Sequence, residues 1–267
     1  METAAPLYRE AEGLWHPAPE TKGPFPGQHA GAVAGLLAGS MERWAAANWQ
    51  GGAEGGAEGG GTGHPAQFAL YLLRPVPVEP LAVEIEAIQS GRRVAVLRAR
   101  LSCKGKLAAF AEMALIRGLE IPTLGPLPDA ARDPESAPPF DLWRYAESPW
   151  YADVCELRQE PGSGGTIWMR ARRPPIADPG PMARTAALAD WISGLTRPDG
   201  PLDPKVGGFP NVDLTVHLAR APQGDWIGAE GLPLWHGGGH GLTATTLRDA
   251  GGVIGRAAQS VVLLPLE

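Results

Sequence analysis

The chain has 267 residues, of which 44% are hydrophobic, enough to bury one large core or two cores of ordinary domain size. Its net charge is −6 with charges of both signs scattered, which excludes the basic stripe that nucleic acid or an anionic membrane would require. Cys103 and Cys155 are too few for a disulfide framework or a cysteine-based zinc site, and are expected to be buried free thiols. No segment has the roughly 18 apolar residues of a membrane span and the N-terminus lacks a signal-peptide pattern, so we expect a cytoplasmic protein without membrane contact.

A helix is predicted between Gly31 and Trp49. Apolar side chains recur there at spacings of three and four residues among many Ala and Gly, as on one buried face of a helix. Residues 51–64, with the sequence GGAEGGAEGGGTGH, offer too few side chains to offset the entropy of ordering their backbone. We predict that they form a mobile loop outside the fold.

Four antiparallel strands are predicted after this loop. The first three alternate apolar with polar or small residues, as half-buried strands do. A turn at residues 104–106 leads into the apolar segment Leu107 to Ile116, which returns as the fourth strand. The alternating apolar residues are Phe68, Leu70 and Leu72, then Leu81, Val83 and Ile85, then Ala95, Leu97, Ala99 and Leu101.

A proline-rich segment divides the chain. Residues 118–142 contain six prolines and neither hydrophobic period, which predicts a semi-extended linker. We therefore place an N-terminal domain at residues 1–120, the linker at 121–145 and a C-terminal domain at 146–267.

The second half repeats the first. Strand-like residues 152–159 and 165–172 precede a helix that opens at Pro181, and further strands follow. A shift of 146 residues lays residues 67–115 over 213–261 without a gap. Because a slip of one residue would turn every buried side chain outward, the preserved register indicates a duplication. The helix carries Leu188, Ile192 and Leu195 on one face, and the shift pairs Phe68 with Leu214, Leu70 with Val216, Leu72 with Leu218 and Gly105 with Gly251.

A long apolar helix followed by a curved antiparallel sheet, present twice, resembles the acyl-CoA thioesterase II family. In the first half the resemblance rests on Gly27-Gln28 and on QFALYLLRPVPVEPLAVEIEAIQSGRRVAVLRARL. In the second half it rests on ALADWISGL, NVDLTVHLARAP and GGVIGRAAQSVVL. The family implies an α+β fold of two tandem hotdog domains, a double hotdog in which each antiparallel sheet wraps round a central helix.

The resemblance also implies a hydrolase of lipid metabolism. Its motifs place Asp190 at the catalytic aspartate and Gln259 at the catalytic glutamine. Asn211 takes the position usually held by threonine, a departure that keeps a donor and an acceptor but loses a rotatable hydroxyl. The expected reaction is hydrolysis of acyl-CoA or a related thioester by an activated water, with no cofactor, no metal and no covalent nucleophile.

The chemistry needs an oriented water, a proton acceptor and donors for the developing oxyanion. Asp190 would accept the proton, while Asn211 and Gln259 would bond to the water or to the carboxylate. The 146-residue shift puts Pro65 and Met113 at the positions of Asn211 and Gln259, so the first half is predicted to be catalytically empty. One active site per chain follows, with the first domain supplying wall and acyl pocket.

Other interpretations stay open. A non-catalytic hotdog protein that binds acyl groups or partners would explain the Asn at the threonine position. A hotdog dehydratase or hydratase would need a His with an acidic residue at the helix, and His29 has no Asp or Glu after it until Glu42. The sequence HGGG from His236 is predicted to be a hairpin loop, because no GxSxG elbow accompanies it, and no acidic or Cys ligand joins His236 and His240 as a metal site. A monomer and a homodimer or higher homo-oligomer are both compatible with the fold.

Overall fold

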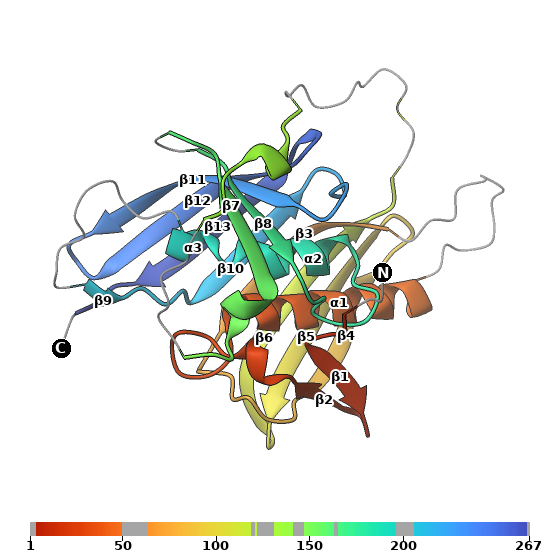
Figure 1. The fold of residues 1–267 in the computed structure, drawn as a ribbon. Helices are drawn as coiled ribbons and strands as arrows, with labels where there is room; N and C mark the ends of the chain where they lie inside the picture. Colours follow the sequence, from red (N-terminus) through yellow and green to blue (C-terminus); the bar gives the residue numbers. More distant parts are fainter. Residues whose placement is uncertain are drawn as a thin grey trace.

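A ten-stranded antiparallel sheet organises the molecule (Figure 1). The computed structural model describes residues 4–49, 63–118, 121, 131–140, 147–162, 165–195 and 206–265. The strand order in the large sheet is β4-β5-β6-β3-β10-β13-β12-β11-β8-β7. Its strands are β3 (His64–Leu72), β4 (Ala82–Ser90), β5 (Val94–Cys103), β6 (Lys106–Ile116), β7 (Cys155–Gln159), β8 (Ile167–Ala171), β10 (Asp213–Leu218), β11 (Ile227–His236), β12 (His240–Asp249) and β13 (Gly252–Val262). Two small sheets pair β1 (Tyr8–Ala11) with β2 (Leu14–Pro17) and β9 (Val206–Gly208) with β14 (Leu264–Pro265).

The strand bounds confirm the predicted duplication. Adding 146 to the bounds of β5 and β6 gives those of β12 and β13. Even the irregularity between Leu101 and Ser102 recurs between Leu247 and Arg248. The two halves meet where β3 pairs antiparallel with β10, Leu70 opposite Leu214. The halves are therefore related by a two-fold axis between these two central strands.

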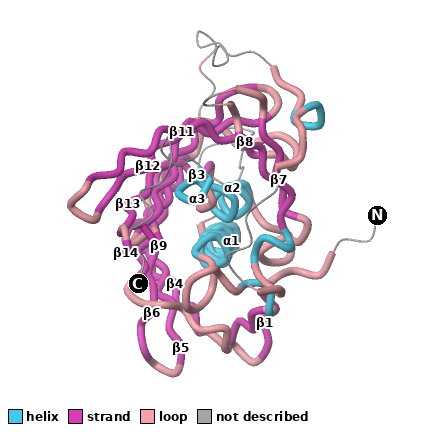
Figure 2. The backbone as a smooth tube through the Cα atoms, turned by 60° about the vertical axis from the view of Figure 1, so that its left-hand side comes forward, coloured by secondary structure: helices cyan, strands magenta, loops and turns pink. Residues whose placement is uncertain are grey.

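In the described part of the chain, α1 (Ala30–Asn48), α2 (Pro181–Ala189) and α3 (Ile192–Leu195) lie on the concave side of the sheet. Figure 2 shows them inside the curve of the strands, with β7 and β8 on their far side. The helix predicted from Gly31 is confirmed, but it is buried on every side from Ala30 to Met41 and not on one face only. It is enclosed because the sheet covers one side of it, while α2 and the segment of Pro175 and Ile176 cover the other. One hydrophobic core consequently joins both halves.

Two predicted elements differ in the structure. The helix that opens at Pro181 ends at Ala189, a turn at Asp190 and Trp191 interrupts it, and α3 follows as a separate element. The strand predicted at 152–159 begins at Cys155, because Tyr151–Val154 form a 3-10 turn. A single run of helical or apolar residues does not reveal such interruptions.

Parts of the predicted loop and linker lie outside the described residues. Of the loop at 51–64 only Gly63 and His64 are described, and His64 already belongs to β3, which corrects the end of that loop. The described part of the predicted linker at 121–145, residues 131–140, is attached to β7, where Pro139 lies opposite Arg158 and the N–H of Phe140 donates to the carbonyl of Leu157. The mobility predicted for 51–64 is untested.

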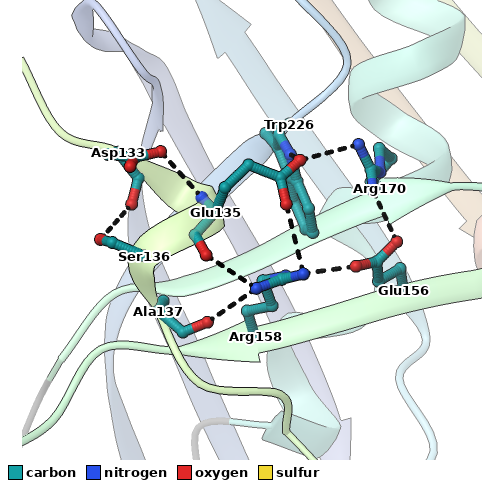
Figure 3. Close-up of polar contacts among 8 residues, drawn as sticks. All are labelled: Asp133, Glu135, Ser136, Ala137, Glu156, Arg158, Arg170 and Trp226. Atoms are coloured by element: carbon teal, nitrogen blue, oxygen red, sulfur yellow. Dashed lines mark hydrogen bonds and ion pairs between the residues drawn. The ribbon is translucent and has the colours of Figure 1, made fainter.

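Glu135 anchors this segment to strands β7 and β8 (Figure 3). Its carboxylate accepts hydrogen bonds from Arg170 at 3.0 Å and from the indole of Trp226 at 3.1 Å, and lies 3.2 Å from Arg158. The two arginines also share the carboxylate of Glu156. Such a network holds its arginine side chains in place more effectively than an isolated surface pair would.

Close packing of the two long helices requires a glycine at position 31. A Cβ there would overlap the carbonyl oxygen of Ala187, where α1 crosses α2, and would press on the ring of Tyr151. Gly31→Ala is therefore expected to lower the free energy of unfolding by about 1 to 3 kcal/mol through overpacking. Urea unfolding followed by circular dichroism measures the change. Gly237→Ala is the control, since nothing lies within 4 Å of a Cβ added there; equal midpoints for both variants would contradict the packing argument.

Candidate active site

Asp190 lies at the turn that ends α2, and only 4% of it is exposed. A carboxylate is disfavoured at the C-terminus of a helix and is costly to bury, so it needs several hydrogen-bond donors. Three side chains contact it, from three separated parts of the chain. Two of them are the residues predicted from the sequence.

The amides of Asn211 and Gln259 both donate to one carboxylate oxygen of Asp190. Asn211 Nδ2 and Gln259 Nε2 each lie 2.8 Å from Asp190 Oδ1. The backbone N–H of Ser193 donates to Gln259 Oε1 at 3.1 Å, which fixes the orientation of that amide. Asn211 comes from the bridge to Val261 that precedes β10, and Gln259 from β13. The structure thus brings the three predicted residues together, while their catalytic role stays a prediction.

His29, from the first half of the chain, is the third contact. Its Nδ1 lies 3.1 Å from the other oxygen, Asp190 Oδ2. The ring stacks on Tyr151 with centroids 4.6 Å apart and lies against Trp191 at 4.4 Å. No acidic residue follows His29 on its own helix before Glu42, and the acid that it contacts comes from the turn after α2. The antiparallel packing of α1 on α2 brings the start of α1 to the end of α2.

The two polar groups next to His29 Nδ1 determine whether this nitrogen carries the proton of the neutral imidazole. Nδ1 is 3.1 Å from the N–H of Gly31, which would require a lone pair, and 3.1 Å from Asp190 Oδ2, which requires a proton. A neutral hydrogen bond contributes about 1 kcal/mol, whereas one to a carboxylate contributes about 1.5 to 3 kcal/mol. A lone pair facing the buried carboxylate would also repel it. We therefore place the proton on Nδ1, which leaves the lone pair on Nε2.

The neighbouring ionisable groups are neutral. Burial raises the pKa of the Tyr151 phenol well above its ordinary value, and its hydroxyl donates to the carbonyl of Ala187 at 2.9 Å. Burial also raises the pKa of the Cys155 thiol to about 12, so it is a poor nucleophile near neutral pH. Cys103 and Cys155 are buried and free, as predicted.

The two-fold axis gives the site a counterpart at the start of α2. A hollow of about 460 Å³ lies there, lined among others by Glu42, Pro65 and Leu115. The Glu42 carboxylate accepts the N–H groups of Met182 at 2.8 Å and Ala183 at 3.1 Å, so it occupies the donors of that helix end. Pro65 and the buried Met113 stand where the other half has Asn211 and Gln259, and offer no polar side chain.

Glu42 should make stability depend on pH. Burial, the largest influence, raises its pKa from 4.5 to about 7 despite the two backbone donors. The folded chain therefore binds more protons than the unfolded chain between these values, and stability is full below pH 4.5 and falls as pH rises toward 7. In Glu42→Gln, the free energy of unfolding should fall less over this pH range, by on the order of 2 kcal/mol. The difference is smaller than for a fully buried carboxyl because the Glu42 side chain is partly exposed.

Urea unfolding between pH 4.5 and 8 tests this expectation. Glu84→Gln, which changes an exposed glutamate on β4, is the control and should keep the slope of the unmodified protein. Parallel stability curves for Glu42→Gln and the unmodified protein would contradict the role assigned to Glu42.

Other motifs in the sequence have ordinary structural roles. Residues 237–239 form the turn between β11 and β12, with His236 opposite His240, as predicted for a hairpin loop. Within the described ranges, no three His, Cys, Asp or Glu side chains gather as a metal site would require. None of the helices in those ranges is long and apolar enough to cross a membrane.

Two halves that each wrap a curved antiparallel sheet round a helix, joined in one sheet, define a double-hotdog protein. Residues 19–117 match the family model of the acyl-CoA thioesterase N-terminal domain, and residues 120–263 match that of the C-terminal domain. The chain therefore belongs to the acyl-CoA thioesterase family. No curated protein sequence matches it at a significant level.

Solved structures share this fold along nearly the whole chain. A candidate thioesterase from Novosphingobium aromaticivorans has a TM-score of 0.69 at 20% identity, over 97% of this chain and 99% of its own. An acyl-CoA thioesterase II from Mycobacterium marinum has a TM-score of 0.65 at 16% identity, over 97% and 95%. A hot dog fold protein of unknown function from Alicyclobacillus acidocaldarius has a TM-score of 0.65 at 18% identity, over 96% and 95%. These likenesses establish the double-hotdog fold.

Proposed function

We propose that the chain hydrolyses acyl-CoA, or a related acyl thioester, to the free acid and the thiol. The observation that supports this most is the buried Asp190 carboxylate, held by Asn211 and Gln259 in a family of thioesterases. A charge kept inside the protein by amides from distant segments has a cost that a purely structural role does not explain.

In the proposed reaction, a water attacks the thioester carbonyl carbon. The negative charge of Asp190 makes removal of the water's proton favourable as the C–O bond forms. Asn211 Nδ2 donates to Asp190, so its Oδ1 is the acceptor that can orient the water. Collapse of the tetrahedral intermediate breaks the C–S bond, and the departing thiolate takes up the proton. The N–H groups in the first turn of α1, which follows His29, would serve the oxyanion.

Release of free thiol from a panel of acyl-CoAs of increasing chain length tests the proposal. We expect catalysed release for at least one chain length, with the counterpart hollow at Glu42 contributing none. Binding of acyl-CoA without thiol release would favour the non-catalytic alternative and overturn the assignment. The cytoplasmic location, the role in lipid metabolism and the domain boundaries are further parts of the proposal, and a monomer and a homo-oligomer are both compatible with it.

A second candidate activity is the addition of water to a 2-enoyl thioester. The contact between His29 and Asp190 favours it, because it supplies the His and acid pair that the sequence lacked along a single helix. The same panel, extended to 2-enoyl-CoA, separates the two reactions. Loss of the conjugated double bond without thiol release would establish the hydratase and contradict the thioesterase.

A further inference from the structure

The imidazole of His29 is held at Nδ1 by Asp190 and packs against two aromatic rings, those of Tyr151 and Trp191, whose centroids lie 5.7 Å from each other. The side chain is 9% exposed, against 3% for that of Asp190. Nε2 makes no hydrogen bond to a described residue, and it is absent from the buried unpartnered atoms of those residues, so it keeps contact with solvent. Nε2 is thus better placed than the Asp190 carboxylate to accept a hydrogen bond from the attacking water.

The carboxylate itself is largely occupied. Asp190 Oδ1 accepts two amide hydrogen bonds, from Asn211 and Gln259, and Oδ2 faces His29. A carboxylate that accepts on both oxygens orients an imidazole and stabilises its protonated form well, whereas it has little room to bind a water directly.

We propose that His29 Nε2 is the atom that receives the water's proton, a proposal that rests on the thioesterase function above. The water oxygen forms a bond to the acyl carbon while its proton moves to Nε2, and Asp190 stabilises the imidazolium. Nε2 then returns the proton to the thiolate as the C–S bond breaks. The acyl thioester and water are converted to acid and thiol, and His29 returns to its neutral form with the proton on Nδ1. Asp190 thereby acts through a residue of the other half, so that both halves build the one site.

The charged group facing His29 is Asp190. From the side of α1, Gln28 is neutral and accepts the hydroxyl of Tyr8, whose pKa burial raises. From the 3-10 turn and β7, Tyr151 and Cys155 both have raised pKa values and stay neutral near pH 7. A general base must be unprotonated to accept the water's proton, so a single acid limb is expected in the pH profile of kcat/KM.

Two amide substitutions separate proton transfer from positioning. His29→Asn puts a donor close to the place of Nδ1 and keeps a good helix N-cap, but it cannot carry a proton. If His29 only positions Asp190, His29→Asn should stay within tenfold of the unmodified enzyme. If His29 is the base, kcat should fall at least a hundredfold with KM within a few fold, and the acid limb should disappear. His236→Asn, in the exposed hairpin, is the matched control.

His29→Ala supplies the complementary test, with circular dichroism to establish that it folds. Imidazole added to this variant should raise its rate at least tenfold, because it can occupy the vacated space beside the rings of Tyr151 and Trp191. Nitrogen-15 NMR of the imidazole in the unmodified enzyme should show a proton on Nδ1 and none on Nε2 above the acid limb.

The outcomes that overturn the proposal are distinct from one another. A His29→Asn enzyme that keeps more than a tenth of its activity and its acid limb, a His29→Ala enzyme that imidazole does not restore, or a proton found on Nε2 would each remove His29 as the base and leave the thioesterase intact. An unmodified chain that releases thiol from no acyl-CoA would remove both proposals.

Discussion

Replacing Asp190 with Asn is expected to lower kcat/KM for acyl-CoA hydrolysis by about a thousandfold, equivalent to about 4 kcal/mol of transition-state stabilisation. The variant loses the negative charge that favours removal of the water's proton. This holds whether the proton moves to the carboxylate or to His29, because the imidazolium would also lose its counter-charge. Steady-state thiol release measures the loss.

The Asp190→Asn variant should still fold. Its amide oxygen can accept from Asn211 and Gln259, and its NH2 group can donate to His29 once the imidazole proton moves to Nε2. Asp225→Asn is the matched control, since its side chain is 79% exposed and 3.9 Å from Arg184. Full activity of Asp190→Asn, with Asp225→Asn also active, would contradict the role of the carboxylate.

Gln259→Met is expected to reduce kcat at least a hundredfold while the fold persists. Met has nearly the volume of Gln, and the two-fold related position already holds a methionine, Met113, with no exposure to solvent. The substitution removes the hydrogen bond to Asp190 Oδ1 and leaves the N–H of Ser193 without its acceptor. The unsatisfied N–H should lower the free energy of unfolding by about 1 to 3 kcal/mol.

Turnover and thermal unfolding, measured together, test the Gln259→Met expectation. Met113→Leu is the matched control in the other half, and should leave kcat unchanged because no polar group is lost there. A Gln259→Met enzyme with unimpaired turnover would refute the assignment of Gln259, and loss of activity in Met113→Leu would show that activity follows core packing.

The duplication was predictable because alternation and burial are local properties of a strand. Phe68 and Leu70 on β3, like Leu214 and Val216 on β10, are fully buried, as the two-residue pattern requires. The turn after β5 was predicted from the glycine at 105 between two lysines, and Gly105 adopts a positive φ of 73° there. Register could therefore be read from sequence even though identities between the halves are few.

The ends and partners of the helices were not predictable in this way. Whether α2 stops at Ala189 depends on the carboxylate of Asp190 finding donors from β13 and from α1, which are distant in sequence. The partner of His29 and the capping of α2 by Glu42 depend equally on the antiparallel packing of α1 on α2. Periodicity reports that a face is buried, but it does not report against which segment.

Among the site residues, Asp190, Asn211 and Gln259 came from motif resemblance, and the structure brings their side chains into contact. The sequence singled out His29 only as a candidate for a hydratase, since its acidic partner, Asp190, lies on another element. A polar aromatic residue directly before a helix whose first ten residues are all apolar was the signal available, since the N-cap of a buried helix end has little contact with solvent and needs a partner.

A single turnover in water labelled with oxygen-18, at an excess of enzyme over acyl-CoA, tests most directly whether an activated water attacks the acyl carbon. Direct attack predicts that the acid released in the first turnover carries one heavy oxygen and that Asp190 carries none. Unlabelled acid from that first turnover, with the label in the peptide that contains Asp190, would mean that the carboxylate attacks as a nucleophile and would contradict the account.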